Sequence, residues 1–292
     1  MMFAQVQSNF NSDNCLVGGA TLDYGPFGFM ERYDPKWCVH CVALCLFNRA
    51  LLIFLRRRAM WVGSGEHYSF GNQVEAARRN WETLISSLEP LLDDVAAATA
   101  ARRGFDDEAK EAEEKTWAAK LGLCWPNGGN GFLPWNDWTK IVCLPEGLAA
   151  ASKLWADVST LLDADIDYTL FWRLLPSAKR SGAHALEALA PAFYVPPSPA
   201  KARRWRDWLA RWRRADPNVH SMNSVNPLFV PREWMLVEAY EAAERGDNSV
   251  IETLQQLFMR PYSDDHDPAL VAKYARRAPD SAHTQGGVGY MS

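Results

Sequence analysis

The sequence lacks the signatures of several common classes of enzyme and binding protein. No Gly-x-Ser-x-Gly motif occurs, so the sequence gives no support for acyl transfer by a nucleophilic serine. The six histidines are scattered without the H-x-x-x-H spacing that pairs two imidazoles on one helical face. The net charge is only −4, which argues against general nucleic-acid binding by bulk electrostatics. Carboxylate and carboxamide side chains are therefore the first candidates for chemistry.

A secretory signal is also missing, and this bears on the six cysteines. Reduced thiols are expected, because disulfides persist mainly in oxidising compartments. Cys38, Cys41 and Cys45 lie in an apolar run, and no second cysteine pair follows at the spacing of a zinc site. Cys124 and Cys143 are distant and show no pairing pattern. The sequence therefore favours neither a metal centre nor a disulfide framework.

The content of apolar residues is high enough for a folded core. The 292 residues are 48% hydrophobic and include thirteen tryptophans. This length fits one large domain or two ordinary ones. Wholesale disorder is excluded by such a composition.

The first thirty residues hold the most informative pattern. Asp13 and Asn14 are followed ten residues later by Asp23, across a short apolar run that contains glycine. Hard oxygen ligands of this kind suit Mg²⁺, which takes one or two carboxylates and completes its octahedron with nucleotide phosphates. The alternative is that these residues only form turns, where Asn, Asp and Gly are common. The pattern alone leaves both interpretations open.

The same residues carry a resemblance to a known family. Asn11-Ser12-Asp13-Asn14, followed by T-L-D-Y-G-P-F-G-F-M-E-R-Y-D-P over 21–35, resembles the selenoprotein O family of protein adenylyltransferases. The resemblance covers most of the chain except roughly 37–60 and 95–145. It resumes at Gly65–Gln73, at the helix with Asn80 and Leu84, at Asp167–Leu174, at Met222–Pro227, at Ala242–Asp247 and at Arg260–Tyr262.

The resemblance implies an activity and a site. Family members transfer AMP from ATP to Ser, Thr or Tyr hydroxyls of proteins, using a kinase-like fold and Mg²⁺ or Mn²⁺. By this match Asp13 takes the position of the catalytic base, while Asn14 and Asp23 take those of the metal and nucleotide ligands. The implied partners are ATP and hydroxyl-bearing proteins, with no nucleic acid and no membrane. The implied location is the mitochondrion.

Members of that family are about twice as long as this chain. They carry an upstream lobe with a Lys and Arg residues that contact ATP, and often a tail with Cys or selenocysteine. Only ten residues precede Asn11 here, and the chain stops at Ser292 without such a tail. We therefore expect a mainly α fold that resembles the C-terminal lobe of a protein kinase, with a short β segment at the metal-binding loop and no N-terminal lobe. We also expect the chain alone to be catalytically weak or inactive.

Three segments follow from the composition: a catalytic and metal-binding loop over 1–36, an apolar insert over 37–60 and a helical lobe over 61–292. The insert is apolar from Trp37 to Leu55 and ends in three arginines. A retained intron translated in frame is the favoured explanation. The alternative is a membrane tether through 37–55, although an Arg near the middle of a spanning helix costs about 2.5–3.5 kcal/mol. A further alternative for the whole chain is a non-catalytic helical binding module.

Periodicity of 3.6 residues predicts helices through most of the remaining chain. The ranges are 75–92, 106–120, 147–162, 166–175, 201–214, 232–245 and 248–259, with loops at 125–138 and 191–199 and a loosely ordered last thirty residues.

Two further patterns suggest ligands but are better explained by packing. Trp205, Trp208 and Trp212 alternate with basic residues, a mixture found at nucleic-acid and membrane surfaces. Their spacing puts all three on one helical face, so a buried tryptophan stripe with a solvated basic back is favoured. Asp163-x-Asp165-x-Asp167 begins like an EF-hand loop, but the required Gly and Glu are missing. This acidic turn is predicted to join two helices.

Overall fold

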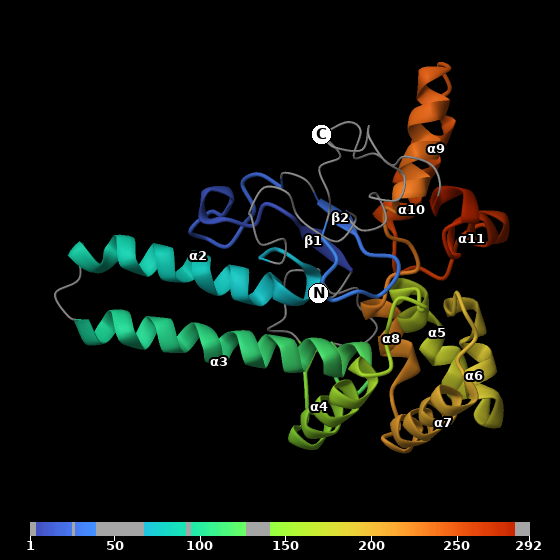
Figure 1. The fold of residues 1–292 in the computed structure, drawn as a ribbon, viewed down its shortest axis with the longest axis horizontal. Coiled ribbons are helices and arrows are strands. Elements are labelled where there is room, and N and C mark those ends of the chain that lie inside the picture. Colours follow the sequence, from blue (N-terminus) through green and yellow to red (C-terminus); the bar gives the residue numbers. More distant parts are fainter. Residues whose placement is uncertain (1–3, 25–26, 39–66, 92–94, 127–140, 284–292) are drawn as a thin grey trace.

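The protein is mainly α-helical, as predicted, in a computed structural model that describes residues 4–24, 27–38, 67–91, 95–126 and 141–283. Of the predicted loop at 125–138, residues 125–126 instead form a short strand and 127–138 lie outside the described residues, as does nearly all of the predicted insert at 37–60. Figure 1 shows the elements. The strands are β1 (Gln5–Gln7), β2 (Phe27–Phe29), β3 (Trp125–Pro126) and β4 (Ile141–Val142); the helices are α2 (Gln73–Leu88), α3 (Val95–Lys120), α4 (Pro145–Ser159), α5 (Tyr168–Arg180), α6 (Ala185–Ala188), α7 (Pro199–Arg214), α8 (Val219–Val225), α9 (Glu233–Glu244), α10 (Ser249–Met259) and α11 (Pro268–Tyr274).

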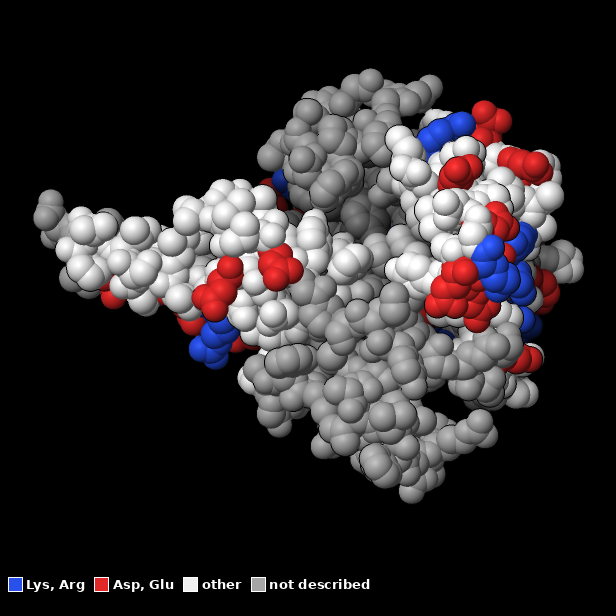
Figure 2. All heavy atoms as spheres, turned by 90° about the horizontal axis from the view of Figure 1, so that it is seen from above, with Lys and Arg blue, Asp and Glu red and all other residues white. Residues whose placement is uncertain are grey.

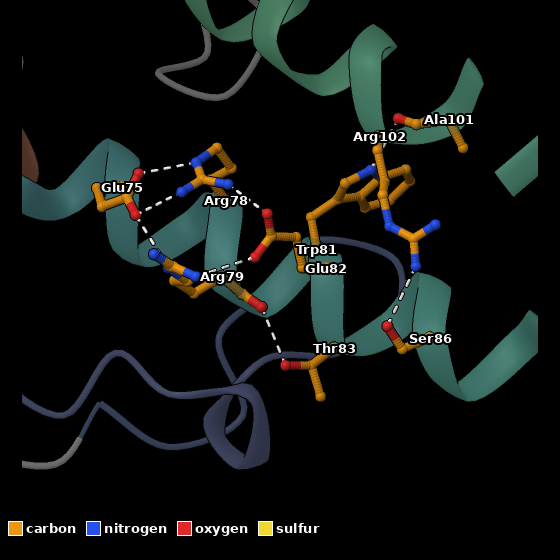
Figure 3. Close-up of polar contacts among 9 residues, drawn as sticks. All are labelled: Glu75, Arg78, Arg79, Trp81, Glu82, Thr83, Ser86, Ala101 and Arg102. Carbon is orange, nitrogen blue, oxygen red and sulfur yellow. Dashed lines mark hydrogen bonds and ion pairs between the residues drawn. The ribbon is translucent and has the colours of Figure 1, made fainter. Parts of the chain in front are cut away.

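Helices α2 and α3 lie antiparallel and project from the body as a two-helix arm (Figure 1). The Trp81 indole donates to the Ala101 carbonyl at 2.9 Å and its ring stacks on Phe105, which joins the two helices. On α2, Arg78 and Arg79 bridge Glu75 and Glu82 in a ladder of ion pairs one turn apart (Figure 3). Such pairs at i, i+3 and i, i+4 stabilise a helix. Helix α3 is longer than predicted, because it begins at Val95.

The C-terminal end of α3 enters the main core. Lys120 is fully buried, its ammonium donates to Asn226 Oδ1 at 2.9 Å, and Asn226 Nδ2 donates back to the Lys120 carbonyl at 3.1 Å. The helix stops at Gly122, whose φ of +74° favours glycine. A Cβ there would lie 2.8 Å from the side chain of Met222, so glycine also permits the close approach of α8.

The predicted tryptophan stripe is confirmed as a packing feature. Trp205, Trp208 and Trp212 on α7 are each 0% exposed. The Trp208 indole donates to the Leu154 carbonyl of α4, and that of Trp212 to the Leu121 carbonyl, each at 2.9 Å. Buried indole N–H groups need such partners. These bonds attach α7 to the ends of α3 and α4.

A second, smaller core forms near the C-terminus. Trp234 of α9 stacks on Tyr274 of α11 with ring centroids 6.0 Å apart, and Tyr274 is 2% exposed. The prediction of a loosely ordered last thirty residues is therefore wrong for 268–274. The sequence signal was an Asp267 cap followed by Pro268 at the first helical position, with the Asp267 carboxylate accepting from the Ala269 amide at 2.8 Å.

The expectation of reduced, unpaired thiols is wrong for two cysteines. Cys124 and Cys143 form a disulfide with Cα atoms 4.6 Å apart. The antiparallel pairing of β3 with β4 places Trp125 opposite Val142, so the next residues outward are the two cysteines. Their separation of 19 residues in sequence gave no sign of this register.

The N-terminal segment joins the helical body through backbone pairing after β2. The Tyr33 amide donates to the Ile166 carbonyl at 2.9 Å, and the Tyr168 amide donates to the Glu31 carbonyl at 2.8 Å. Tyr33 stacks on Tyr168, with centroids 5.6 Å apart. The segment that follows β2 is therefore held against the start of α5.

The surface carries charges of both signs. On the face shown in Figure 2, Lys and Arg side chains lie beside Asp and Glu side chains on both the arm and the body. Among the described helices, none combines the length and the apolar character needed to span a bilayer. The predicted tether at 37–55 falls almost entirely outside the described residues.

Candidate active site

The predicted site residues lie in a loop that β1 and β2 hold at both ends. The two strands pair antiparallel, with Val6 opposite Gly28 and Gln7 opposite Phe27. Val6 is fully buried, which anchors the short sheet to the core. The short β segment expected at the metal-binding loop is therefore present, and it brings the two ends of the loop together.

Asp13 and Asn14 occupy a single 3₁₀ turn, η1 (Ser12–Asn14), at the start of this loop. The Asp13 side chain is exposed and that of Asn14 is buried. The Asn14 amide nitrogen Nδ2 donates to the Asn9 carbonyl at 2.7 Å. This bond fixes one end of the Asn14 carboxamide.

Asp23 comes back toward the same turn. Cys15 forms an antiparallel bridge with Thr21, and the Leu22 amide donates to the Asn14 carbonyl at 2.8 Å. Gln7 Nε2 then donates to the Asp23 carbonyl at 2.9 Å, which fixes the backbone of Asp23 next to β1. The structure thus brings Asn14 and the neighbour of Asp23 into direct backbone contact. The Asp23 side chain is exposed.

The start of α2 contacts β1, the strand that leads into the loop. Gln73 Nε2 donates to the Gln7 carbonyl at 3.2 Å and to the Tyr68 carbonyl at 2.7 Å. The Cys38 thiol donates to Ser8 Oγ at 3.2 Å, so this cysteine packs beside β1. Burial, and then the negative charge of Asp13, raise the pKa of Tyr68. Asp13 therefore acts electrostatically on a phenol that belongs to the segment before α2.

A buried ion cluster connects this loop to the helical body, and the sequence analysis missed it. Arg232 is 2% exposed and donates to both carboxylate oxygens of Asp167, at 2.6 and 3.0 Å. Glu31, two residues beyond β2, lies 3.6 Å from the same guanidinium. Burial raises the pKa of Glu31 to about 7, although the charge of Arg232 opposes the shift. Asp167 also caps α5, so the predicted acidic turn is indeed a helix junction.

The oxygen donors of the loop fit a divalent cation of the Mg²⁺ type. Asp13 and Asp23 offer exposed carboxylates, and Asn14 offers a carboxamide oxygen. Asn11 Oδ1 is buried and has no hydrogen-bond partner, although Asn at a helix N-cap ordinarily accepts from the turn. Within the described part of the chain, no group of three or more His, Cys, Asp or Glu side chains is placed to hold a metal. Carboxylate and carboxamide oxygens are the donors that Mg²⁺ takes from proteins, in sets of one or two, with other ligands completing its octahedron.

A hollow of about 380 Å³ lies away from this loop, between α2 and α3. Its lining mixes acidic and basic side chains from both helices with a few apolar ones. The lining residues are Gly71, Val74, Glu75, Arg78, Phe105, Asp106, Ala109, Lys110 and Glu113. None of the predicted site residues contributes to this lining.

Comparison with known proteins shows the family of the chain. The family model described as protein adenylyltransferase SelO matches residues 3–42 and 58–259. The chain therefore belongs to the SelO family of protein adenylyltransferases. The family model leaves 43–57 unmatched, a stretch inside the apolar segment.

Curated relatives carry the name protein nucleotidyltransferase YdiU. One from Aromatoleum aromaticum is 29% identical over 98% of this chain and 48% of its own length. One from a Mycobacterium species (strain KMS) is 29% identical over 96% of this chain and 49% of its own length. One from Flavobacterium johnsoniae is 27% identical over 98% of this chain. The chain spans about half the length of the curated relatives it matches.

Proposed function

We propose that this chain carries the catalytic and metal-binding loop of a protein adenylyltransferase that moves AMP from ATP to Ser, Thr or Tyr hydroxyls. The observation that carries the proposal is the loop itself. It places Asn14 in backbone contact with the neighbour of Asp23, and it lies within the segment that matches the family. The mainly helical fold around it is the proposed counterpart of a kinase C-terminal lobe.

The proposed roles follow from the chemistry of each side chain. Asn14 and Asp23 hold Mg²⁺ or Mn²⁺ through oxygen atoms, and the bound ion supplies neutralisation of phosphate charge. Asp13 is exposed and accepts the proton of the incoming hydroxyl as a general base. The hydroxyl oxygen bonds to the α-phosphorus of ATP, and pyrophosphate leaves with the electron pair of the broken bond.

Two features indicate that this loop works together with further protein. The first Lys or Arg of the chain is Arg32, so the loop has no basic side chain of its own for the triphosphate. The loop also exposes several large apolar side chains. They are Leu16, Val17, Leu22, Tyr24 and Phe27, from 44% to 80% exposed. An apolar surface of this kind is normally covered in a working assembly. The half of the relatives without a counterpart here is the proposed cover and the proposed source of phosphate-binding cations.

The test compares Mn²⁺ binding in the presence of ATP for the wild-type chain, Asp23→Ala and a control. Asp107→Ala is the matched control, because Asp107 is an exposed carboxylate on α3 outside the loop. Binding that Asp23→Ala weakens and Asp107→Ala preserves is the expected result. Equal binding by all three proteins, or none by any, would contradict the proposal and favour the alternative of a non-catalytic helical binding module.

Transfer of AMP is tested separately with α-labelled ATP. The protein used is this chain fused to the part of a relative that has no counterpart in it. Incorporation of label into protein, lost in Asp13→Ala, is expected. A mitochondrial location, implied only by the resemblance, remains a proposal that localisation of the tagged protein would test.

A further inference from the structure

Helix α2 reaches into the candidate site through one side chain, Asn80. Its amide nitrogen Nδ2 donates to the Phe10 carbonyl at 3.1 Å and to Cys15 Sγ at 3.5 Å. Phe10 comes just before the Asn11–Asn14 turn and Cys15 just after it. One carboxamide therefore binds both ends of the turn that carries Asp13 and Asn14, across 65 to 70 residues of sequence.

The other contacts described for the turn come from the loop itself: Asn14 bonds to the carbonyl of Asn9 and to the amide of Leu22, and Cys15 pairs with Thr21. The three-residue helix η1 has no side-chain cap, and Asp13 points toward solvent. Its own backbone bonds, from Asn14 to Asn11 and from Cys15 to Ser12, are 3.2 and 3.3 Å long. A short turn of this kind depends on external contacts to keep one conformation.

The helix that presents Asn80 is rigid on its other sides. Trp81, the next residue, is fixed to α3 through the Ala101 carbonyl and the Phe105 ring. The ion pairs between Glu75, Arg78, Arg79 and Glu82 lie along the same turns of α2 (Figure 3). A catalytic loop supported by a packed helix keeps its geometry better than one supported by another loop.

We propose that Asn80 is a positioning residue for the metal-binding turn. It fixes Phe10 and Cys15 on either side of the turn, so that the turn keeps one conformation in which Asn14 would hold a cation, and it is not proposed to touch the substrate. This inference rests on the proposed function. Partners that orient metal ligands typically change metal affinity by 10- to 100-fold when they are removed.

The test measures the Mn²⁺ dissociation constant with ATP present, together with the melting temperature, for the full chain. Asn80→Ala is expected to raise the dissociation constant about 10-fold. Thr83→Ala is the matched control, because Thr83 lies on the same helix, is exposed and bonds only to the Arg79 carbonyl of α2. Cys15→Ala removes only the longer of the two contacts, so a smaller loss than for Asn80→Ala is expected.

The Mn²⁺ affinity and the melting temperature together decide the inference. A raised dissociation constant for Asn80→Ala with a melting temperature near that of Thr83→Ala supports it. A lowered melting temperature with unchanged Mn²⁺ affinity overturns it, because Asn80 then serves only stability. If the wild-type chain itself binds no Mn²⁺, the proposed function fails and the role of Asn80 fails with it; if the wild type binds and Asn80→Ala binds equally, the inference alone fails.

Discussion

Arg232 and Asp167 form a two-point ion pair inside the protein, with Nη1–Oδ2 and Nη2–Oδ1 distances of 2.6 and 3.0 Å. Asp167 is 0% exposed and caps α5, while Arg232 precedes α9. The pair therefore links the two cores of the molecule and, through Glu31, the segment that follows the candidate site. A planar guanidinium matches a carboxylate in this two-point geometry better than any other side chain.

Removal of the guanidinium should destabilise the fold strongly. Arg232→Ala leaves Asp167 buried without its cation, and the expected loss is about 3–5 kcal/mol in the free energy of unfolding. Urea denaturation followed by circular dichroism measures it. Arg245→Ala, at the exposed C-terminal end of the same helix, should change stability by less than about 0.5 kcal/mol. Equal losses of unfolding free energy in the two variants would show that the buried ion pair stabilises the fold no more than an exposed charge does.

Glu31 should make stability depend on pH around neutrality. Its pKa rises from 4.5 to about 7 on folding, first because of burial, with Arg232 opposing the shift and Asp167 and Glu233 adding to it. The folded protein therefore holds this proton more tightly than the unfolded chain. The contribution of Glu31 to stability is complete below pH 4.5 and is lost as the pH rises through about 7.

The size of this effect is at most about 3 kcal/mol, at ~1.4 kcal/mol per pKa unit. Glu31→Gln keeps the shape and cannot ionise, so its unfolding free energy should fall less between pH 4.5 and 7 than that of the wild type. Urea titrations at several pH values measure the two slopes. Glu244→Gln, an exposed glutamate on α9, should keep the wild-type slope. A wild-type slope in Glu31→Gln would rule out this source of pH dependence.

The disulfide between Cys124 and Cys143 should contribute measurable stability. It closes a loop between the end of α3 and the start of α4, and a bridge of this length typically adds about 2–4 kcal/mol. The double variant Cys124→Ala/Cys143→Ala should lose that amount and become insensitive to reductant. Thermal melts with and without dithiothreitol measure both effects. A wild-type melting temperature that reductant leaves unchanged would contradict the prediction.

The two faces of α7 should respond very differently to substitution. Trp208→Ala removes a fully buried ring, its stacking on Trp212 and its bond to the Leu154 carbonyl, for an expected loss of about 3–5 kcal/mol. Arg214→Ala, on the exposed side, should cost under about 0.5 kcal/mol. Denaturant unfolding of both variants measures the contrast. A large loss for Arg214→Ala alone would mean that the basic face carries the structural role.

Local patterns allowed most of the helices to be predicted. The tryptophan spacing placed α7 within two residues of its observed start, because burial of one face and a helical period produce the same signal. The helix predicted over 147–162 likewise overlaps most of α4. The positions of these central helices could therefore be predicted from the amino-acid sequence alone.

Contacts between residues that are far apart in the sequence could not be predicted from local patterns. The burial of Glu31, Asp167 and Arg232 was not predicted, because charged side chains are seldom buried unless paired and the partners lie 65 residues or more apart. The disulfide depends on strand register across a loop. At the candidate site, the residue types of Asp13, Asn14 and Asp23 suggested the chemistry, whereas the support from Asn80 exists only in three dimensions.

The backbone pairing of Tyr33 with Ile166, and of Glu31 with Tyr168, has a consequence for biosynthesis. The ribosome makes the segment after β2 before it makes the residues with which that segment pairs, which follow more than 130 positions later in the sequence. Arg232, which completes the buried cluster, comes later still. We therefore expect the N-terminal loop to lack its native contacts during translation. Its leucines and aromatic rings are then exposed to solvent. Domains assembled from such remote contacts fold slowly and are prone to aggregate on the way.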